Sequence, residues 1–158
     1  MFVELLTVHE IALLVDVRTA AGSRRHPHFG ADALATSLPD RGVAYRRCQA
    51  LGGWRRPVAD SPTGGWRNES FRGYADHAMS EEFARALAEL RGMASEQRTV
   101  MMCAEALWWR CHRRLIADRL VVSGDTVCHI GSDGHACAHR LSAFATVDAA
   151  GGVTYPAT

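Results

Sequence analysis

Residues 11–18 read Ile11-Ala12-Leu13-Leu14-Val15-Asp16-Val17-Arg18, a continuous apolar run that ends in two opposite charges. A strand that is apolar on both faces must be covered on both sides, as in a parallel sheet flanked by helices. The run therefore predicts a central strand of an α/β fold. Its carboxyl end would carry the side chains of Asp16 and Arg18.

Helical and extended patterns alternate along the rest of the chain. Ser80, followed by two glutamates and by apolar residues at helical spacing, predicts a capped helix at 80–94. Such alternation is typical of a three-layer α/β fold with a mostly parallel sheet flanked by helices. The expected helices lie near 2–6, 31–38, 80–94 and 111–122, and the expected strands at 11–18, 42–47, 99–103 and 126–130.

The length and composition fit a single domain over residues 1–158, because 158 residues with 47% hydrophobic side chains can build one substantial core. The longest apolar stretches are too short to cross a bilayer and no leader segment opens the chain, so we expect a cytoplasmic protein without a membrane partner. Five cysteines, an odd number, predict free thiols rather than a disulfide framework.

Residues 51–74 are rich in glycine and proline, which predicts a long loop with little regular structure. Loops of this length inside a compact domain are usually functional or mobile. Four aromatic residues provide anchors that we expect to hold the loop against the domain. They are Trp54, Trp66, Phe71 and Tyr74.

The densest group of reactive side chains follows the strand expected at 99–103. It reads Cys103-Ala104-Glu105-Ala106-Leu107-Trp108-Trp109-Arg110-Cys111-His112-Arg113-Arg114. In open α/β sheets, ligands bind beyond the carboxyl ends of the strands. If the expected strands are parallel, this segment converges there with Asp16, Arg18 and His129.

This segment predicts a thiolate site. Cys111 and His112 would open the helix expected at 111–122, where unpaired backbone amides attract anions and lower the pKa of a thiol. Either Cys111 or Cys103 could be the nucleophile, with His112 beside it and Glu105 as proton acceptor or orienting group. Alternatively, Cys103 is a core thiol. The residues expected to help hold a small anionic ligand or nucleotide are Asp16, Arg18, Arg24, Arg25, Tyr74, Arg110, Arg113 and His129.

The positive charges of the chain are all carried by arginine, since none of its 18 basic residues is a lysine. A planar guanidinium group can grip a carboxylate or a phosphate with two hydrogen bonds. Solvated surface arginines are the simpler interpretation for most of them. Four adjacent pairs occur, at Arg24-Arg25, Arg46-Arg47, Arg55-Arg56 and Arg113-Arg114.

Several ordered motifs resemble a known family. They are Leu14-Val15-Asp16-Val17-Arg18, Ser23-Arg24-Arg25-His26-Pro27-His28-Phe29, Leu51-Gly52-Gly53, Phe71-Arg72-Gly73-Tyr74-Ala75-Asp76, and Met102-Cys103-Ala104-Glu105 followed by Cys111-His112-Arg113. On these residues the chain is identified as a member of the family of domains of unknown function numbered 488. The resemblance extends over nearly the whole chain and implies an α/β fold, but it implies no established reaction or cofactor.

The chain departs from that family at two points. Members usually begin with a strand that carries Thr-Ile-Gly-His-Ser, whereas this chain starts inside what resembles the following helix. A missing first strand would remove a His-Ser pair from the site and leave a sheet position unpaired, which favours a homodimer. The second departure is His26, where the family tends to have asparagine. More remotely, the Asp-Val-Arg strand and the cysteine loop before a helix are similar to rhodanese-type sulfurtransferases.

Three functions are compatible with these residues. The first is an enzyme that uses a thiolate for sulfur transfer, redox exchange or attack on an anionic substrate. The second is a nucleic-acid or nucleotide binding module, based on arginine pairs interleaved with tryptophans. The third is a metal site built from mixed sulfur, nitrogen and oxygen ligands. Its ligands would be Cys103, Glu105, Cys111, His112 and either His129 or His135.

Overall fold

The computed structural model describes residues 1–22 and 24–158. Ser23, one residue of the motif at 23–29, lies outside the described residues. None of the described helices is long and apolar enough to span a membrane. The helices are α1 (Phe2–Val8), α2 (Ala31–Ser37), α3 (Glu69–His77), α4 (Glu81–Glu96) and α5 (Arg113–Val122). The strands are β1 (Leu13–Asp16), β2 (Ala44–Arg47), β3 (Thr99–Met102), β4 (Cys128–Ile130), β5 (Ala136–Ala138), β6 (Thr146–Val147) and β7 (Val153–Thr154).

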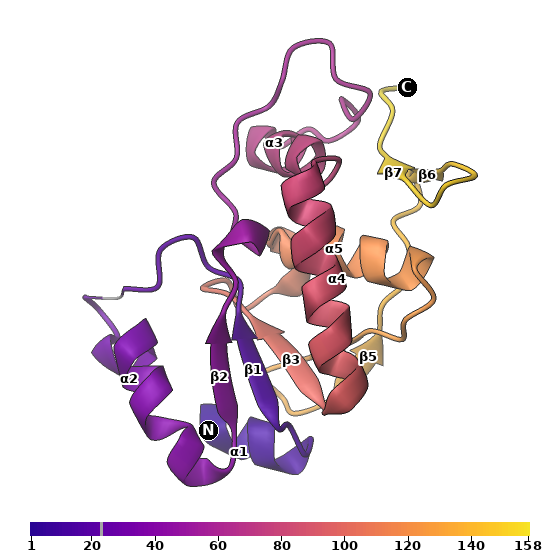
Figure 1. Cartoon of the computed structure of the whole chain (residues 1–158). Helices are drawn as coiled ribbons and strands as arrows, with labels where there is room; N and C mark the ends of the chain where they lie inside the picture. Colours follow the sequence, from indigo (N-terminus) through magenta and orange to yellow (C-terminus); the bar gives the residue numbers. More distant parts are fainter. Residues whose placement is uncertain (23) are drawn as a thin grey trace.

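A parallel sheet of three strands forms the centre of the molecule, in the order β2, β1, β3 (Figure 1). Asp16, the last residue of β1, pairs with Arg47 of β2 on one side and with Met102 of β3 on the other. The three strands therefore end at the same level. The predicted α/β fold with a parallel sheet is confirmed, and the carboxyl ends of its strands form one edge.

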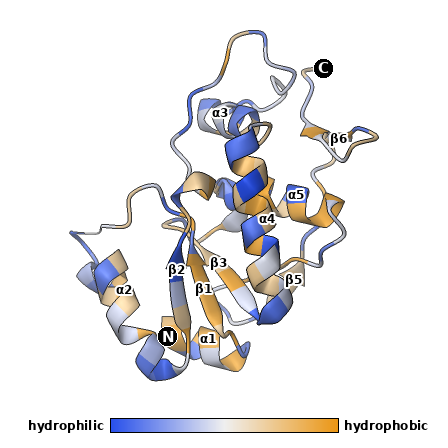
Figure 2. Cartoon of the chain, viewed as in Figure 1, coloured by the Kyte–Doolittle hydropathy of each residue, from blue (hydrophilic) through white to orange (hydrophobic). Residues whose placement is uncertain are grey.

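Helices cover both faces of this sheet, which explains why β1 is apolar throughout. Leu13, Val15 and Val17 pack with residues of α3, α4 and α5 in one core cluster. Leu14 points to the other face and packs with residues of α1 and α2 in a second cluster. Figure 2 shows β1 and β3 as hydrophobic strands, whereas the edge strand β2 is hydrophilic toward its end.

Helix α4 covers the centre of one face and has the start that its sequence predicts. The Ser80 hydroxyl accepts a hydrogen bond from the Phe83 N–H at 3.1 Å, and acidic residues fill the first turn. Phe83, Ala86, Leu87 and Leu90 form the buried stripe. The helix thus supplies one wall of the core beside β1 and β3.

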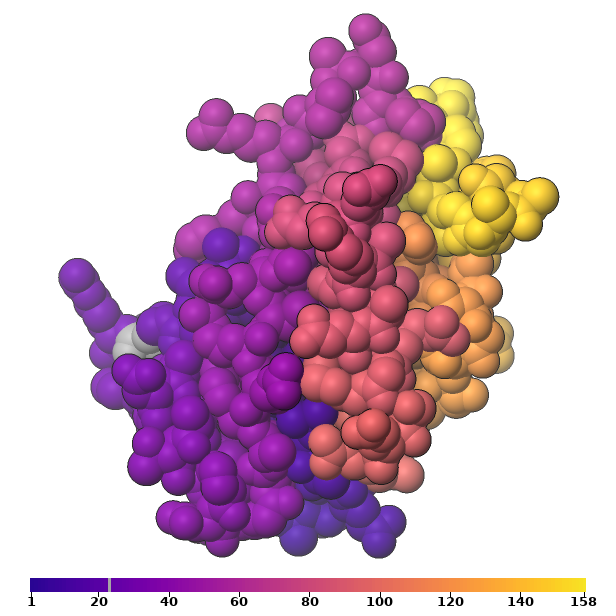
Figure 3. Space-filling model, in the orientation of Figure 1, coloured from indigo at the N-terminus to yellow at the C-terminus, as the bar shows by residue number. Residues whose placement is uncertain are grey.

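The strand expected at 126–130 forms, but it does not join the parallel sheet. Strand β4 pairs antiparallel with β5, and His129 lies opposite Cys137. Strands β6 and β7 make a second small hairpin near the end of the chain. Figure 3 shows the C-terminal residues, in yellow, packed directly against segments from the middle of the chain. The expectation that His129 ends a strand parallel to β1 is therefore wrong.

The segment at 51–74 is irregular only in its first part. The Asn68 side chain accepts hydrogen bonds from the N–H groups of Ser70 and Phe71, at 2.8 and 3.3 Å, and so caps α3. Most of the segment is irregular, as predicted, and α3 begins at Glu69 because of this cap.

Three of the four aromatic anchors predicted in this segment pack as expected. Trp66 and Tyr74 are buried, and the ring of Phe71 meets that of Trp66 edge to face, with centroids 5.0 Å apart. Trp54 does not, because 81% of its surface is exposed. The expectation that Trp54 anchors the segment is therefore wrong.

Two glycines inside helices lie in opposite surroundings. A Cβ atom at Gly73 of α3 would lie 2.0 Å from the Arg55 carbonyl oxygen, whereas nothing lies within 4 Å of a Cβ at Gly92 of α4. We expect Gly73→Ala to lower the free energy of unfolding by about 1 to 3 kcal/mol through overpacking. Gly92→Ala should raise it by about 0.5 to 1 kcal/mol through helix propensity. Urea denaturation of both variants would check this, and shifts of the same sign would contradict it.

Candidate functional site

Two sulfur atoms meet at the carboxyl end of the sheet. Cys103 follows β3 directly and Cys111 comes just before α5, and their Sγ atoms are 2.7 Å apart. Both cysteines are free thiols. Cys111 is 4% exposed, and Cys103 is partly exposed. Sulfur atoms this close share a hydrogen bond, and a small movement would bring them to the disulfide bond length of about 2.05 Å.

The start of α5 stabilises negative charge on Cys111. The helix begins at Arg113 with His112 as its N-cap residue, two residues later than the start predicted at Cys111. The backbone N–H and the Nε–H of Arg113 each donate to the Cys111 Sγ atom at 3.4 Å. Although Cys111 and His112 do not open the helix as expected, the helix terminus still directs an amide at the sulfur.

The two thiols of this pair differ in acidity. The hydrogen bond from Cys103 lowers the pKa of Cys111 to about 3, helped by the hydrogen bond and charge of His112 and by the Arg113 N–H, against the opposing effect of burial. The hydrogen bond to Cys111, together with burial, raises the pKa of Cys103 well above its usual value. Cys111 is thus the thiolate and Cys103 the thiol that donates to it.

His112 links the sulfur pair to the central strand. Its Nε2–H donates to the Val17 carbonyl oxygen at 2.9 Å, and its Nδ1 lies 3.6 Å from the Cys111 Sγ atom. A ring protonated on both nitrogens donates to both groups and offsets the thiolate charge. The buried ring of Tyr74 lies against the imidazole, with centroids 4.9 Å apart, and the Tyr74 hydroxyl donates to the Leu51 carbonyl oxygen at 2.7 Å.

The motif Leu51-Gly52-Gly53 brings another backbone segment to this ring. A Cβ atom at Gly52 would lie 2.4 Å from the Thr19 Oγ1 atom, and one at Gly53 would lie 3.1 Å from the His112 Nδ1 atom. The Thr19 hydroxyl also donates to the Gly53 carbonyl oxygen at 2.7 Å. A side chain at Gly52 would therefore clash, whereas one at Gly53 would require a small shift of the His112 ring.

Asp16 and Arg18 form a buried ion pair at the end of β1. The Arg18 Nε and Nη2 groups donate to the two carboxylate oxygens at 2.8 and 2.6 Å, and the Tyr45 hydroxyl donates to Oδ2 at 2.5 Å. Burial raises the pKa of Asp16, but the hydrogen bonds from Arg18 and Tyr45 outweigh burial and leave it lowered. Burial and the bond to Asp16 raise the pKa of Tyr45 to about 12.

Two hollows meet at the sulfur pair. The larger, of about 770 Å³, is mainly apolar and runs along β3 between α1, α4 and β4. The smaller, of about 310 Å³, is lined by both cysteines, His112, Arg110 and Trp54 among others. Arg18, Ala20, Cys103, Ala104 and Glu105 border both hollows.

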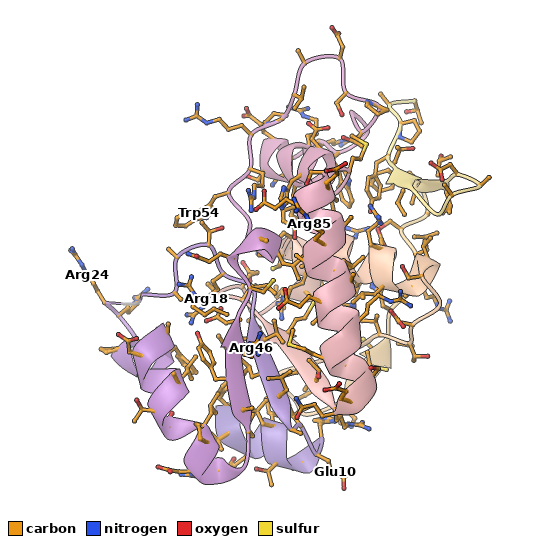
Figure 4. The ribbon with its side chains drawn as sticks, viewed as in Figure 1. Glu10, Arg18, Arg24, Arg46, Trp54 and Arg85 are labelled. Carbon is orange, nitrogen blue, oxygen red and sulfur yellow. The ribbon has the colours of Figure 1, made fainter. Side chains whose placement is uncertain are left out.

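The other predicted site residues divide between these hollows and the outer surface. Tyr74 lines the smaller hollow, and Arg113 and His129 line the larger. The Glu105 side chain accepts from the Leu107 N–H at 3.2 Å. Arg24 and Arg25 are exposed and line neither hollow, and Figure 4 shows Arg24 pointing away from the molecule.

A buried hydrogen-bonded chain behind the cysteine loop was not predicted. The rings of Trp108 and His129 stack with centroids 3.9 Å apart. The His129 Nε2 and His139 Nδ1 atoms are 2.8 Å apart, and the His139 Nε2–H donates to the Asp118 Oδ1 atom at 2.7 Å. The Tyr155 hydroxyl donates to Asp118 Oδ2 at 2.7 Å. The one signal in the sequence for this buried group of hydrogen bonds is Asp118, which stands among the apolar residues of α5.

The surroundings of His129 in this hydrogen-bonded group also determine the charge of its ring. Burial, followed by the nearby His139 and Arg113, lowers the pKa of His129 to about 4. The ring that stacks on Trp108 is therefore neutral near pH 7. A neutral ring held in one orientation fixes the position of Trp108, and with it the loop between the two cysteines.

The ligands expected for a metal ion are not assembled as a set. Over residues 1–22 and 24–158, no group of three or more His, Cys, Asp or Glu side chains is placed to hold a metal ion. His135, one of the expected ligands, instead lies on the exposed turn before β5 and pairs with Asp133 at 3.4 Å.

Comparison with known proteins agrees with the motifs. The model of the family described as domain of unknown function DUF488 matches residues 1–120, which include the central sheet and both cysteines of the pair. No curated protein and no solved structure matches the chain. Because the matched residues make up well over half of its length, the chain belongs to the DUF488 family.

Proposed function

We propose that this protein is a thiol-dependent redox enzyme, in which Cys103 and Cys111 exchange electrons with a small disulfide substrate. The observation that carries the proposal is the 2.7 Å separation of the two sulfur atoms. The unequal pKa values support it, because the thiolate is the attacking form of a cysteine and a thiol next to it can complete the exchange.

The exchange has two steps. The Cys111 thiolate attacks one sulfur of a substrate R–S–S–R′, which forms a Cys111–S–S–R bond and expels R′–S⁻; this product takes a proton from the His112 imidazolium. Cys103 then attacks the Cys111 Sγ atom, its proton passes to the departing R–S⁻, and the Cys103–Cys111 disulfide forms. Two electrons move from the cysteine pair to the substrate, which leaves as two thiols.

The smaller hollow favours a substrate that carries a negative charge. Arg110 lines it, and within the described part of the chain the Arg110 guanidinium has no hydrogen-bond or ion-pair partner. Arg18 also lines it, although Asp16 already neutralises that charge. The cycle suits the cytoplasm, where a reducing thiol pool would return the pair to its dithiol form.

Trapping of the intermediate tests this proposal. In a background with Cys48, Cys128 and Cys137 changed to serine, 2-hydroxyethyl disulfide should convert the pair to an intramolecular disulfide, detected by intact mass as the loss of two hydrogens. Adding Cys103→Ser should trap a mixed disulfide on Cys111, because the resolving thiol is gone. The matched Cys111→Ser variant should accumulate much less adduct.

Two results would overturn the proposal. One is a pair that stays reduced, or reacts no faster than glutathione, under the same conditions. The other is a mixed disulfide that persists in the variant retaining both Cys103 and Cys111, since sulfurs this close should resolve it rapidly.

A further inference from the structure

Trp54 presents a large aromatic ring to solvent. The side chain is 81% exposed, and Figure 4 shows it beyond the end of the sheet on the same side as Arg18. Its φ angle is 61°, in the left-handed region that bulky residues rarely adopt. Neither burial nor backbone preference explains a tryptophan at this position.

The neighbouring backbone holds Trp54 in this conformation. The Thr19 hydroxyl donates to the Gly53 carbonyl oxygen at 2.7 Å, on one side of the residue. On the other side, the Arg55 Nε and Nη2 groups donate to the carbonyl oxygens of Gly52 and Gln49 at 3.2 and 3.3 Å. Strained residues persist where the surroundings determine their conformation, and they cluster at functional sites.

Trp54 is one of the residues that line the smaller hollow. Trp54, Phe71 and Tyr74 give this hollow three aromatic residues, and Cys111 and His112 line it as well. Its volume of about 310 Å³ is at the lower end of the range for small-molecule sites. A molecule bound in this hollow beside Cys111 would therefore have Trp54 among its neighbours.

We propose that Trp54 determines substrate specificity by stacking on a planar group of the disulfide that enters the smaller hollow. The inference rests on the proposed redox function and adds the substrate class, a small disulfide with an aromatic or similarly flat group. An exposed indole offers such a group a large face, and the backbone that carries it is already ordered before binding.

Two uncharged disulfides test the inference without involving Arg110. The second-order rate constants for 4,4′-dithiodipyridine, which is aromatic, and for 2-hydroxyethyl disulfide, which is aliphatic, are measured in the background that keeps only Cys103 and Cys111. The rate constant for each disulfide is divided by the rate constant of glutathione with that disulfide. This ratio corrects for the different intrinsic reactivities of the two disulfides. We expect Trp54→Ala to slow the aromatic reaction about fivefold to tenfold and to leave the aliphatic one unchanged.

Two further variants act as controls. Trp54→Phe keeps an aromatic face and should retain most of the preference for the aromatic disulfide. Val58→Ala removes another exposed apolar side chain of the same segment, 65% exposed, and should change neither rate. A general disturbance of the segment would instead slow both reagents in all three variants.

The possible failures are distinguishable. If the protein with intact Trp54 reacts with neither disulfide faster than glutathione does, the redox function itself is wrong. If it reacts rapidly with both and Trp54→Ala leaves the ratio of the two rates unchanged, the redox function stands and the role of Trp54 is wrong.

Discussion

Replacing Cys111 with serine should lower the rate of alkylation by iodoacetamide at pH 5 by about tenfold, in the background that keeps only the cysteine pair. Two effects oppose each other here. With a pKa near 3, Cys111 is fully ionised at pH 5, whereas roughly one in 3,000 ordinary thiols with a pKa of 8.5 is a thiolate. A strongly acidic thiol is a weaker nucleophile, however, and a Brønsted slope of about 0.4 to 0.5 cancels most of that advantage.

The shape of the pH profile separates the two thiols further. Alkylation of Cys111 should be nearly constant between pH 5 and pH 8 and should fall only toward its pKa of about 3. The Cys111→Ser variant should instead react about tenfold faster with each added pH unit, as an ordinary thiol does. Cys103→Ala is the matched variant, because it removes the hydrogen bond from Cys103 and should therefore raise the pKa of Cys111 and shift its profile to higher pH.

The alkylation rate constants measured at each pH can also contradict the assignment of Cys111 as the thiolate. Equal slopes in the pair background and in Cys111→Ser would show that Cys111 carries no thiolate at pH 5. The ultraviolet absorbance of the thiolate provides an independent readout, since it should persist at pH 5 in the pair background and be absent from the Cys111→Ser variant.

The second large effect is on stability. Asp118→Ala should lower the free energy of unfolding by about 3 to 5 kcal/mol at pH 7. Asp118 is fully buried and accepts hydrogen bonds from His139, Ser142 and Tyr155. Its replacement leaves these donors without an acceptor inside the protein, and a buried donor without a partner costs more than an average hydrogen bond contributes.

The contribution of Asp118 should depend on pH in a defined direction. Burial raises its pKa, but the hydrogen bonds from His139, Tyr155 and Ser142 outweigh burial and leave the pKa below the usual value for an aspartate. A carboxyl group with a lowered folded-state pKa stabilises the fold above its unfolded-state pKa and loses that effect as the pH falls through the folded-state value. The difference between the original protein and Asp118→Ala should therefore shrink below about pH 4.

Urea denaturation at pH 7 and at pH 3.5 would measure both effects. Asp125→Asn is the control, because Asp125 pairs with Arg91 at the surface, where both side chains are more than a third exposed. Its loss should cost less than about 1 kcal/mol. An Asp118→Ala effect as small as this would mean that the buried chain of hydrogen bonds does not form.

The sequence was most informative where the pattern is local. The apolar run at 11–18 requires cover on both faces, and the structure places helices on each. Cys103 and Cys111 are only eight residues apart, so one tight turn can bring their sulfurs together, and their proximity to Asp16 follows from the parallel strands.

Long-range partners were beyond the reach of the sequence. The run at 126–130 has the composition of a strand, but nothing in it distinguishes a parallel neighbour from the antiparallel β5. Tyr45 reaches Asp16 only because of the register between β2 and β1. The exposure of Trp54 depends on backbone hydrogen bonds made by Thr19 and Arg55, and the glycine and proline content of the loop does not show them.

The chain of hydrogen bonds from Asp118 has a consequence for the limits of the domain. The match to the family model ends at Leu120, yet the described groups that donate to the Asp118 carboxylate come from residues 139–155. Val153 and Tyr155 also belong to the main core cluster. A fragment that stops at residue 120 would end inside α5 and leave a buried charge uncompensated. The C-terminal residues beyond the family match thus complete the core of the unit that carries the sulfur pair.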